Sequence, residues 1–350
     1  MSDGGDGFGE IIGGLMGAEP IEIETVDAAH RPHKATFWLH PPTRTAIVEA
    51  AQVNGLALLP PGKYHPFELD TFGLGKVYLT AAEVSATKII VGIGGSSTND
   101  GGFGFASGLG CQFLDHEGHP IQKWTDLENL DRIIMPAHQP FIETIVAVDV
   151  ENPLLGPNGA SRIYGPQKGL RAGDMQKAEA CLARLATVWR ATNERVAARM
   201  FGWSAAAGKD LCDYANVPGT GAAGGLGFGL LAFVGAKFRS GFTVFSEAAH
   251  LPSRLKSADL VISGEGAMDE QSLMGKGVGS LFQLCEKQGV RFIGLAGSLS
   301  RDVTQRFSRN EKLSLWGIVP SLATLEQSKA HPAKWLSTLA SEAARSVGFV

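Results

Sequence analysis

The residues best suited to chemistry in this chain form a loop at positions 94–102, with the sequence GGSSTNDGG. The loop directly follows residues 87–93 (TKIIVGI), an apolar run that predicts a buried strand. In open α/β sheets, ligands bind beyond the carboxyl ends of strands. Glycine N–H groups and Ser or Thr hydroxyls at such a turn can hold a phosphate or carboxylate. A polar turn that caps a helix explains the loop equally well when it is taken alone.

A second cluster follows another apolar run, residues 258–263 (ADLVIS). It contains Glu265 and Asp269 within the sequence GEGAMD, and Lys276 comes seven residues after Asp269. Two carboxylates and a lysine at a strand end could bind Mg²⁺ and the oxygens of a phosphate. A solvated turn in which Asp269 caps a helix explains the cluster equally well.

A third candidate is Asp149, at the end of the apolar run formed by residues 144–150. A carboxylate at a strand tip is well placed to act as a general base or a metal ligand. An aspartate in this position also commonly begins a turn. The polar segment that follows continues to Lys168 within the sequence YGPQKG.

Two further glycine-rich segments carry weaker signals. Residues 219–224 (GTGAAG) match the dinucleotide pattern G-x-G-x-x-G, but the preceding segment is polar and contains Pro218. A glycine-rich lead into a helix at residues 226–237 is therefore the better interpretation. By composition, the SDGGDG segment at residues 2–7 reads as a frayed terminus.

The elements that must position these residues alternate between strands and helices. Apolar runs predict buried strands at residues 87–93, 144–150, 258–263, 290–296 and 316–319. Apolar residues at three- and four-residue spacing predict helices at residues 46–53, 174–199, 277–288 and 332–347. This alternation predicts an α/β fold. The length predicts two domains, and turn-forming residues suggest boundaries near residues 60–61 and 252.

Composition excludes several classes of protein. The 350 residues carry a formal net charge of −4, so no basic field attracts nucleic acid or an anionic membrane. The four cysteines are far apart, which is typical of reduced thiols in a cytoplasmic protein. The longest apolar run, residues 229–236, is too short to span a bilayer, and the N-terminus does not resemble a signal peptide. We expect a soluble cytoplasmic protein.

Taken in order, the motifs resemble those of the type I glycerate kinases of bacteria. The similarity runs in register from Ser2 to about Leu299, through DGGDGFGE, DTFGLGK, GIGGSSTNDGG, DVENPLLGPNGASRIYGPQKG, VPGTGAAGGLGFGLLAF and DLVISGEGAMDEQSLMGK. The resemblance implies Mg²⁺-dependent transfer of the ATP γ-phosphoryl group to D-glycerate, usually giving 2-phosphoglycerate. It also implies a Rossmann-like parallel-sheet domain made from both chain ends, residues 1–48 and 256–350. The resemblance further implies that an α/β domain with a mixed sheet, residues 49–255, is inserted between these two segments. The active site would lie in the cleft between the two domains.

The resemblance also assigns roles to individual residues. The expected catalytic residues are Asp149, Lys168 and Asp100. The expected ligands of substrate or phosphate are Asp3, Gly94, Gly95, Ser96, Ser97, Thr98 and Asn99. The expected nucleotide-binding residues are Gly264, Glu265, Gly266, Asp269 and Lys276. Asp149 and Asp269 are the expected metal ligands, and ATP, Mg²⁺ and glycerate are the expected small molecules. We expect a monomer or a homodimer.

The chain departs from the family pattern at several places. The family has a strand, an A-P-D-S-[FY]-K turn and a helix before the DGG motif, whereas this sequence starts at the motif, so we expect the first strand and helix to be missing. Ala267 stands where the family has arginine, and Phe72 and Lys76 also differ from the usual residues. Two alternatives therefore stay open: a kinase for a related short hydroxy acid, and a catalytically silent paralogue that binds a metabolite.

Overall fold

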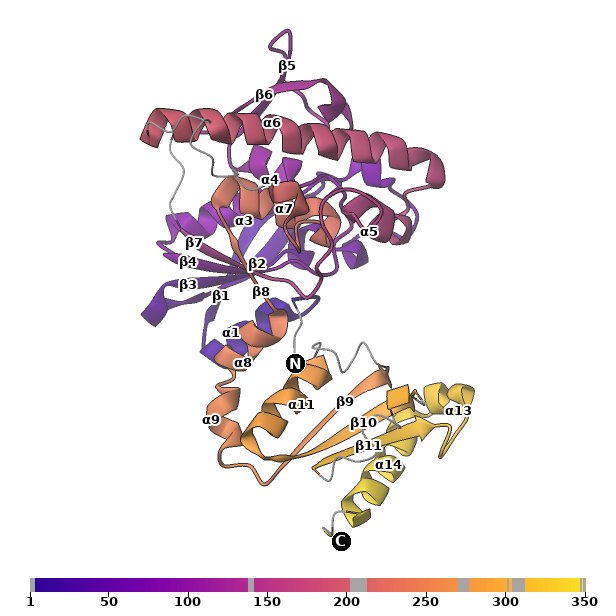
Figure 1. Ribbon diagram of the computed structural model, residues 1–350. Helices are drawn as coiled ribbons and strands as arrows, with labels where there is room; N and C mark the ends of the chain where they lie inside the picture. Colours follow the sequence, from indigo (N-terminus) through magenta and orange to yellow (C-terminus); the bar gives the residue numbers. More distant parts are fainter. Residues whose placement is uncertain are drawn as a thin grey trace. The chain divides into compact units, whose positions relative to one another are not determined.

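The computed structural model forms two compact units, an N-terminal unit, Ser2–Val244, and a C-terminal unit, Phe245–Val350. It describes residues 4–137, 142–201, 213–269, 277–300, 302–303, 312–346 and 348. Each unit is built around its own sheet (Figure 1).

The N-terminal unit is organised by a six-stranded mixed sheet with the strand order β1-β2-β3-β4-β7-β8. The strands are β1 (Glu19–Val26), β2 (Pro32–His40), β3 (Thr45–Glu49), β4 (Lys88–Gly92), β7 (Glu143–Ala147) and β8 (Lys237–Arg239). The strands from β1 to β3 pair antiparallel, and those from β3 to β8 pair parallel. All five residues of β3 are buried, as a parallel strand covered on both faces requires. The predicted α/β fold with a mixed sheet is confirmed.

Helices and a small hairpin complete this unit. The helices are α1 (Phe8–Met16), α2 (Ala51–Asn54), α3 (Phe72–Glu83), α4 (Phe103–Gly108), α5 (Ala160–Lys168), α6 (Met175–Phe201), α7 (Ala222–Val234) and α8 (Gly241–Ala248), of which α8 runs into the C-terminal unit. The hairpin consists of β5 (Gln112–Asp115) and β6 (Leu130–Ile134). One large apolar core joins the sheet to these helices, with Phe37, Tyr78, Phe105 and Trp124 at most 2% exposed.

The C-terminal unit contains a parallel three-stranded sheet with the order β11-β10-β9. Its strands are β9 (Leu260–Met268), β10 (Arg291–Leu299) and β11 (Leu313–Val319). Its helices are α9 (Leu251–Leu255), α11 (Gly277–Gln288), α13 (Leu325–Ala330) and α14 (Pro332–Ser346). Helix α11 packs on β9 and β10, and α14 packs on β10 and β11. The parallel sheet expected near the C-terminus is confirmed.

Two predictions about the N-terminal part of the chain are wrong. Residues 46–53 form strand β3 and the short helix α2 instead of one helix, because the run Ala46–Val48 is buried between two neighbouring strands. The expected domain made of residues 1–48 and 256–350 is also not seen. The described residues of that first segment belong to the N-terminal unit, because β3 pairs with β2 and β4 in one sheet. Hairpin β1–β2 was not predicted.

Two other features bear on the expectations from composition. Cys111, Cys181 and Cys285 are buried free thiols, whereas Cys212 lies outside the described residues. Within the part of the chain that the structure describes, no helix combines the length and the apolar character needed to cross a membrane.

Candidate functional site

The N-terminal unit brings several of the singled-out residues to one edge of its sheet. Strands β3, β4 and β7 run parallel, so Glu49, Gly92 and Ala147 end at the same edge. Beyond that edge lie helix α2, the loop at residues 94–102 and Asp149. Because the carboxyl edge of a parallel sheet is where ligands collect, this edge is the candidate site.

The accessible part of the loop lies in the turn Gly94-Gly95-Ser96, in which Gly94 is half-buried, Gly95 is exposed and Ser96 is buried. Gly95 is exposed, and its φ of +73° is a left-handed conformation that glycine adopts without strain. Its carbonyl accepts a hydrogen bond from the N–H of Leu56. The N–H groups of Gly95 and Ser96 donate to no atom of the described residues. Two such adjacent amides can hold an anion.

The N-terminal glycine segment packs against this turn. The N–H of Gly94 donates to the carbonyl of Gly4 at 2.8 Å. A Cβ on Gly95 would lie 2.5 Å from Oδ1 of Asp6, so this exposed carboxylate lies directly beside the turn. The prediction of a frayed terminus is therefore wrong for the described residues from Gly4 onward. Asp6 was not selected from the sequence, although the DGGDG motif contained the signal, and the expected ligand Asp3 lies outside the described residues.

The remainder of the loop faces the interior. Ser97, Thr98, Asn99 and Asp100 are all 0% exposed. The hydroxyl of Ser97 donates to the carbonyl of Asn54 at 2.9 Å, and Nδ2 of Asn99 donates to Oγ of Ser161 at 2.9 Å. The side chains of Ser97 and Asn99 therefore hold the loop against distant segments, and within residues 94–100 only Gly95 is exposed.

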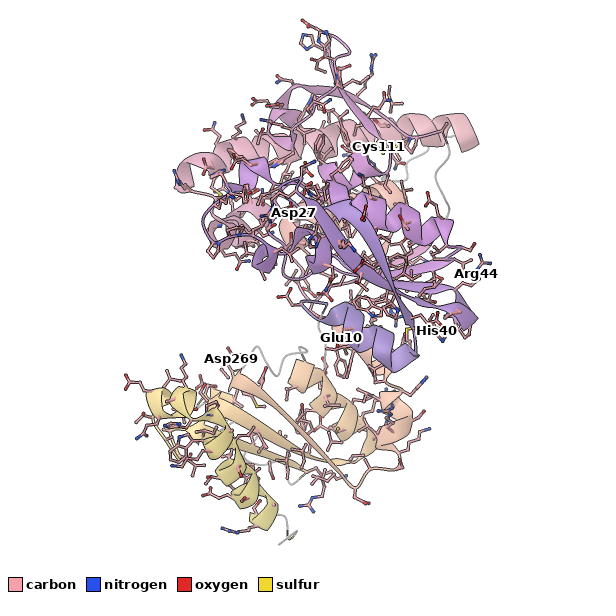
Figure 2. The ribbon with its side chains drawn as sticks, turned by 180° about the vertical axis from the view of Figure 1, so that it is seen from behind. Glu10, Asp27, His40, Arg44, Cys111 and Asp269 are labelled. Carbon is pink, nitrogen blue, oxygen red and sulfur yellow. The ribbon has the colours of Figure 1, made fainter. Side chains whose placement is uncertain are left out.

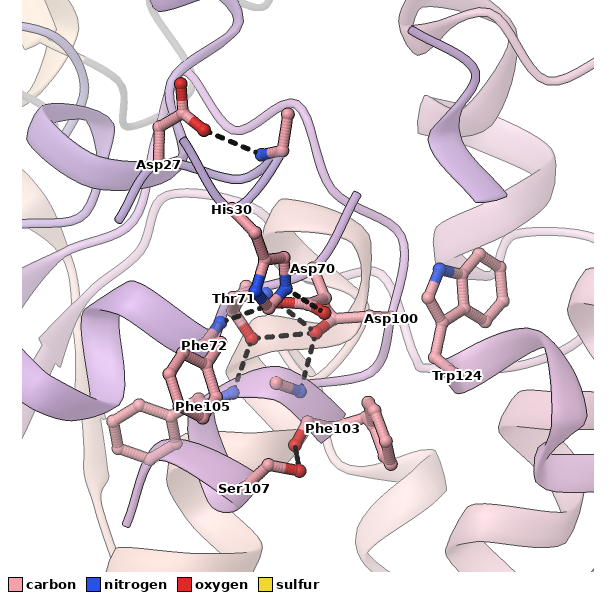
Figure 3. Close-up of polar contacts among 12 residues, drawn as sticks. Asp27, His30, Asp70, Thr71, Phe72, Asp100, Phe103, Phe105, Ser107 and Trp124 are labelled. Atoms are coloured by element: carbon pink, nitrogen blue, oxygen red, sulfur yellow. Dashed lines mark hydrogen bonds and ion pairs between the residues drawn. The ribbon is translucent and has the colours of Figure 1, made fainter. Parts of the chain in front are cut away.

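Asp100 is the centre of a buried hydrogen-bond network (Figure 3). Its Oδ2 accepts hydrogen bonds from the N–H and the hydroxyl of Thr71, at 3.0 and 2.7 Å, and from the N–H of Gly104 at 2.9 Å. Burial raises the pKa of Asp100, the neighbouring charge of Asp70 raises it further, and these hydrogen bonds oppose the rise. The network joins the start of α3 to the start of α4. This geometry makes Asp100 a structural anchor of the loop.

Asp70 extends this region to the β1–β2 turn. Its Oδ2 lies 2.8 Å from Nε2 of His30, which has a left-handed φ of +58°. The His30 ring stacks on Phe72, with 5.5 Å between centroids, and Nζ of Lys76 lies 5.3 Å from the Phe72 centroid. The hydrogen bond to Asp70 raises the pKa of His30. Two of the residues at which the sequence departs from the family, Phe72 and Lys76, thus contact each other beside His30.

Lys168 is buried, with 7% of its surface exposed. Its Nζ donates to the carbonyl of Thr98 at 2.6 Å. Burial lowers the pKa of Lys168 to about 7, and the charge of Asp100 opposes this effect. The structure shows this amine bonded to the loop, and its role as a phosphate clamp stays a prediction.

The segment at residues 219–225 supports the loop from another side. The N–H of Gly101 donates to the carbonyl of Gly224 at 3.0 Å. A Cβ on Gly224 would lie 1.9 Å from the carbonyl oxygen of Thr98, so the close approach requires glycine. Residues 223–225 have left-handed backbone angles, and regular helical geometry begins only after them. The interpretation of this segment as the lead into a helix is confirmed.

Asp149 follows β7 and is partly buried. Its Oδ1 accepts a hydrogen bond from the N–H of Gly241 at 3.0 Å, at the start of α8. The structure thus places Asp149 at the expected edge and gives it a helix-capping contact.

The second predicted cluster lies in the C-terminal unit. Gly264, Glu265 and Gly266 are within β9, because this strand continues five residues beyond the predicted end at residue 263. Asp269 follows the end of β9 (Figure 2). Lys276 lies outside the described residues.

The mixed sheet, and a glycine turn whose two amides have no acceptor among the described residues, define an α/β protein suited to bind a small anionic ligand. The model of the glycerate kinase family matches residues 1–348. A glycerate kinase of Halalkalibacterium halodurans is 33% identical over 354 residues, which cover 100% of this chain and 87% of that protein. A glycerate 2-kinase of Escherichia coli K12 is 34% identical over 332 residues, which cover 93% of this chain and 82% of that protein.

A solved structure agrees with these sequence matches. The crystal structure of a candidate glycerate kinase 2 from Salmonella typhimurium LT2 has a TM-score of 0.72 and 29% sequence identity, covering 99% of this chain and 88% of that chain. The chain therefore belongs to the glycerate kinase family and is an enzyme of that family.

Proposed function

We propose that this enzyme transfers the γ-phosphoryl group of ATP to a hydroxyl of D-glycerate, with 2-phosphoglycerate as the product. Family membership over residues 1–348 is the observation that carries this proposal. The turn Gly94-Gly95-Ser96 supports it, because two adjacent amides there have no acceptor among the described residues. Phosphoryl transfer depends mainly on positioning and on stabilising charge, and such amides contribute to both.

We propose that Gly95 and Ser96 bind a phosphate or carboxylate oxygen through their N–H groups. Lys168 and Asp100, both buried, act by shaping the loop that carries these amides. We further propose that Gly264, Glu265, Gly266, Asp269 and Lys276 bind the nucleotide. The end of β9 supports this assignment, because it is the carboxyl end of a parallel strand.

We propose Mg²⁺ as the cation that accompanies ATP. Within the described residues, no three His, Cys, Asp or Glu side chains cluster as a protein-only metal site. Mg²⁺ nevertheless fits, because it is usually bound by one or two carboxylates together with substrate phosphates. Asp6 is suited to this role, because it is exposed beside the turn and no described atom forms a hydrogen bond or ion pair with it. Asp149 is the second candidate, and its Oδ1 already accepts a bond from Gly241. When bound, the metal would neutralise phosphate charge.

A coupled assay of ADP release tests the function directly. The purified chain should turn over D-glycerate with Mg²⁺ and ATP faster than L-glycerate, tartronate or longer sugar acids. Phosphorus NMR of the product should show the phosphate on the 2-hydroxyl. Faster turnover of another hydroxy acid would overturn the substrate assignment, and no turnover of any of them would overturn the proposed activity.

A further inference from the structure

Glu49 is a buried carboxylate at the end of β3, and no motif in the sequence drew attention to it. Its side chain is 4% exposed. Its Oε1 accepts a hydrogen bond from the N–H of Gly7 at 2.9 Å, and its Oε2 accepts one from the N–H of Gly9 at 2.9 Å. Hydrogen bonds to an ionised acceptor are about twice as strong as neutral ones.

These two bonds give acceptors to two N–H groups at the start of helix α1. The helix begins after Gly7, which has a left-handed φ of 79° and provides no side-chain cap. The first N–H groups of a helix lack acceptors within the helix, and a negative charge near them is favourable. Glu49 therefore supplies from a neighbouring strand the cap that a local Ser or Asp would normally supply.

The anchored segment is the one that reaches the turn. Gly4 accepts the bond from Gly94, and the Asp6 carboxylate lies against Gly95. Asp6 directly precedes Gly7, whose N–H is held by Glu49. The position of Asp6 is therefore fixed on one side by the turn and on the other by Glu49.

We propose that Glu49 is a positioning residue for phosphoryl transfer, which acts through Gly7 and Gly9 to hold Asp6 where it meets the cation on the transferred phosphate. This inference rests on the proposed function of the same site. It adds a residue that does not touch the substrate, and it assigns Asp6 as the residue through which Glu49 acts.

The decisive variant is Glu49→Gln, which keeps the shape of the side chain but replaces one acceptor oxygen with a donor. One N–H at the start of α1 then faces an NH₂ group and loses its partner. Substitution of groups that orient a metal ligand typically costs 10- to 100-fold in metal affinity or activity. We expect kcat to fall by about that factor, and Mn²⁺ affinity in the presence of ADP, measured by electron paramagnetic resonance, to fall in parallel.

The matched control is Glu10→Gln, which removes a carboxylate from the first turn of the same helix. Glu10 is exposed on α1 (Figure 2), so its removal should leave kcat and Mn²⁺ affinity unchanged. Circular dichroism and thermal unfolding of each variant separate loss of folding from loss of positioning. If Glu49→Gln does not fold, Glu49→Asp replaces it, because it keeps the charge but retracts it by one methylene.

A double-mutant cycle with Asp6→Asn tests the route of the effect. If Glu49 acts through Asp6, the double variant should be no less active than Asp6→Asn alone, so the two effects should not add. Additive losses would overturn the inference, as would full activity and Mn²⁺ affinity in a folded Glu49→Gln variant. An inactive wild-type protein would count against the proposed function, whereas the Mn²⁺ titrations of the variants would still test the positioning.

Discussion

The buried amine of Lys168 should make the stability of this protein depend on pH in a way that a single substitution removes. Lys168 is almost completely buried, and among the residues that the structure describes its amine donates only to the carbonyl of Thr98. Burial lowers its pKa from 10.5 to about 7. In the unfolded chain the amine of Lys168 has the ordinary lysine pKa of 10.5. Between pH 7 and pH 10.5 the unfolded state therefore binds one more proton than the folded state.

The sign and size of the effect follow from proton linkage. The free energy of unfolding rises with pH wherever the unfolded state binds more protons, by about 1.4 kcal/mol per pH unit for one proton. At pH 7 the folded amine is half protonated, so the slope is about half of this value, and it reaches the full value near pH 8. Integrated from pH 7 to pH 9, the contribution of Lys168 is about 2 kcal/mol.

Replacement of Lys168 by methionine removes the titrating group and keeps the length of the side chain. Urea unfolding of the wild type and of Lys168→Met at pH 7, 8 and 9 should show the stability difference shifting by about 2 kcal/mol in favour of the wild type. The control is Lys177→Met, an exposed lysine on α6, which should show no such trend. A difference between Lys168→Met and wild type that stays constant across this pH range would refute a neutral buried amine.

Two further predictions concern the backbone around the site. Gly224→Ala should destabilise the protein by at least about 2 kcal/mol, because the φ of Gly224 is +70° and a Cβ would collide with the carbonyl of Thr98. The control is Gly14→Ala on the open face of α1, which should be neutral or stabilising. Urea unfolding of both variants measures the difference. His30→Asn keeps a residue that tolerates the left-handed backbone but removes the ring paired with Asp70. Because the pKa of His30 is raised, its stabilisation is fully present below pH 6.5 and is lost as pH rises through the folded value. The melting temperature should therefore fall more at pH 5.5 than at pH 9, and equal losses at both pH values would contradict this ion pair.

The expected positions of the elements were accurate where the pattern is local. Helix α6 and helix α11 follow the three- and four-residue apolar spacing of their segments, and strands β4 and β7 follow short apolar runs. Residues 46–53 were assigned wrongly because their alanines and valines suit a helix as well as a buried strand. Only the pairing of β3 with β2 and β4 decides between them. The extension of β9 through a GEG segment was missed for the same reason, since glycine within a strand is tolerated only when a neighbouring strand supplies the hydrogen bonds.

The sequence by itself determined the family, the α/β class and the glycine-rich loop after β4, because these depend on residue types in fixed local order. Tertiary structure alone decided which loop residues face outward. Ser97, Thr98, Asn99 and Asp100 have the polarity of ligands, yet all four are buried. The side-chain hydrogen-bond partners of Ser97, Asn99 and Asp100 come from segments distant in the chain. It also revealed two further residues. Asp6 lies beside the loop although about 90 residues separate them in the sequence, and Glu49 caps helix α1 from about 40 residues away. Burial and long-range hydrogen bonding are properties of the folded chain, so no local pattern encodes them.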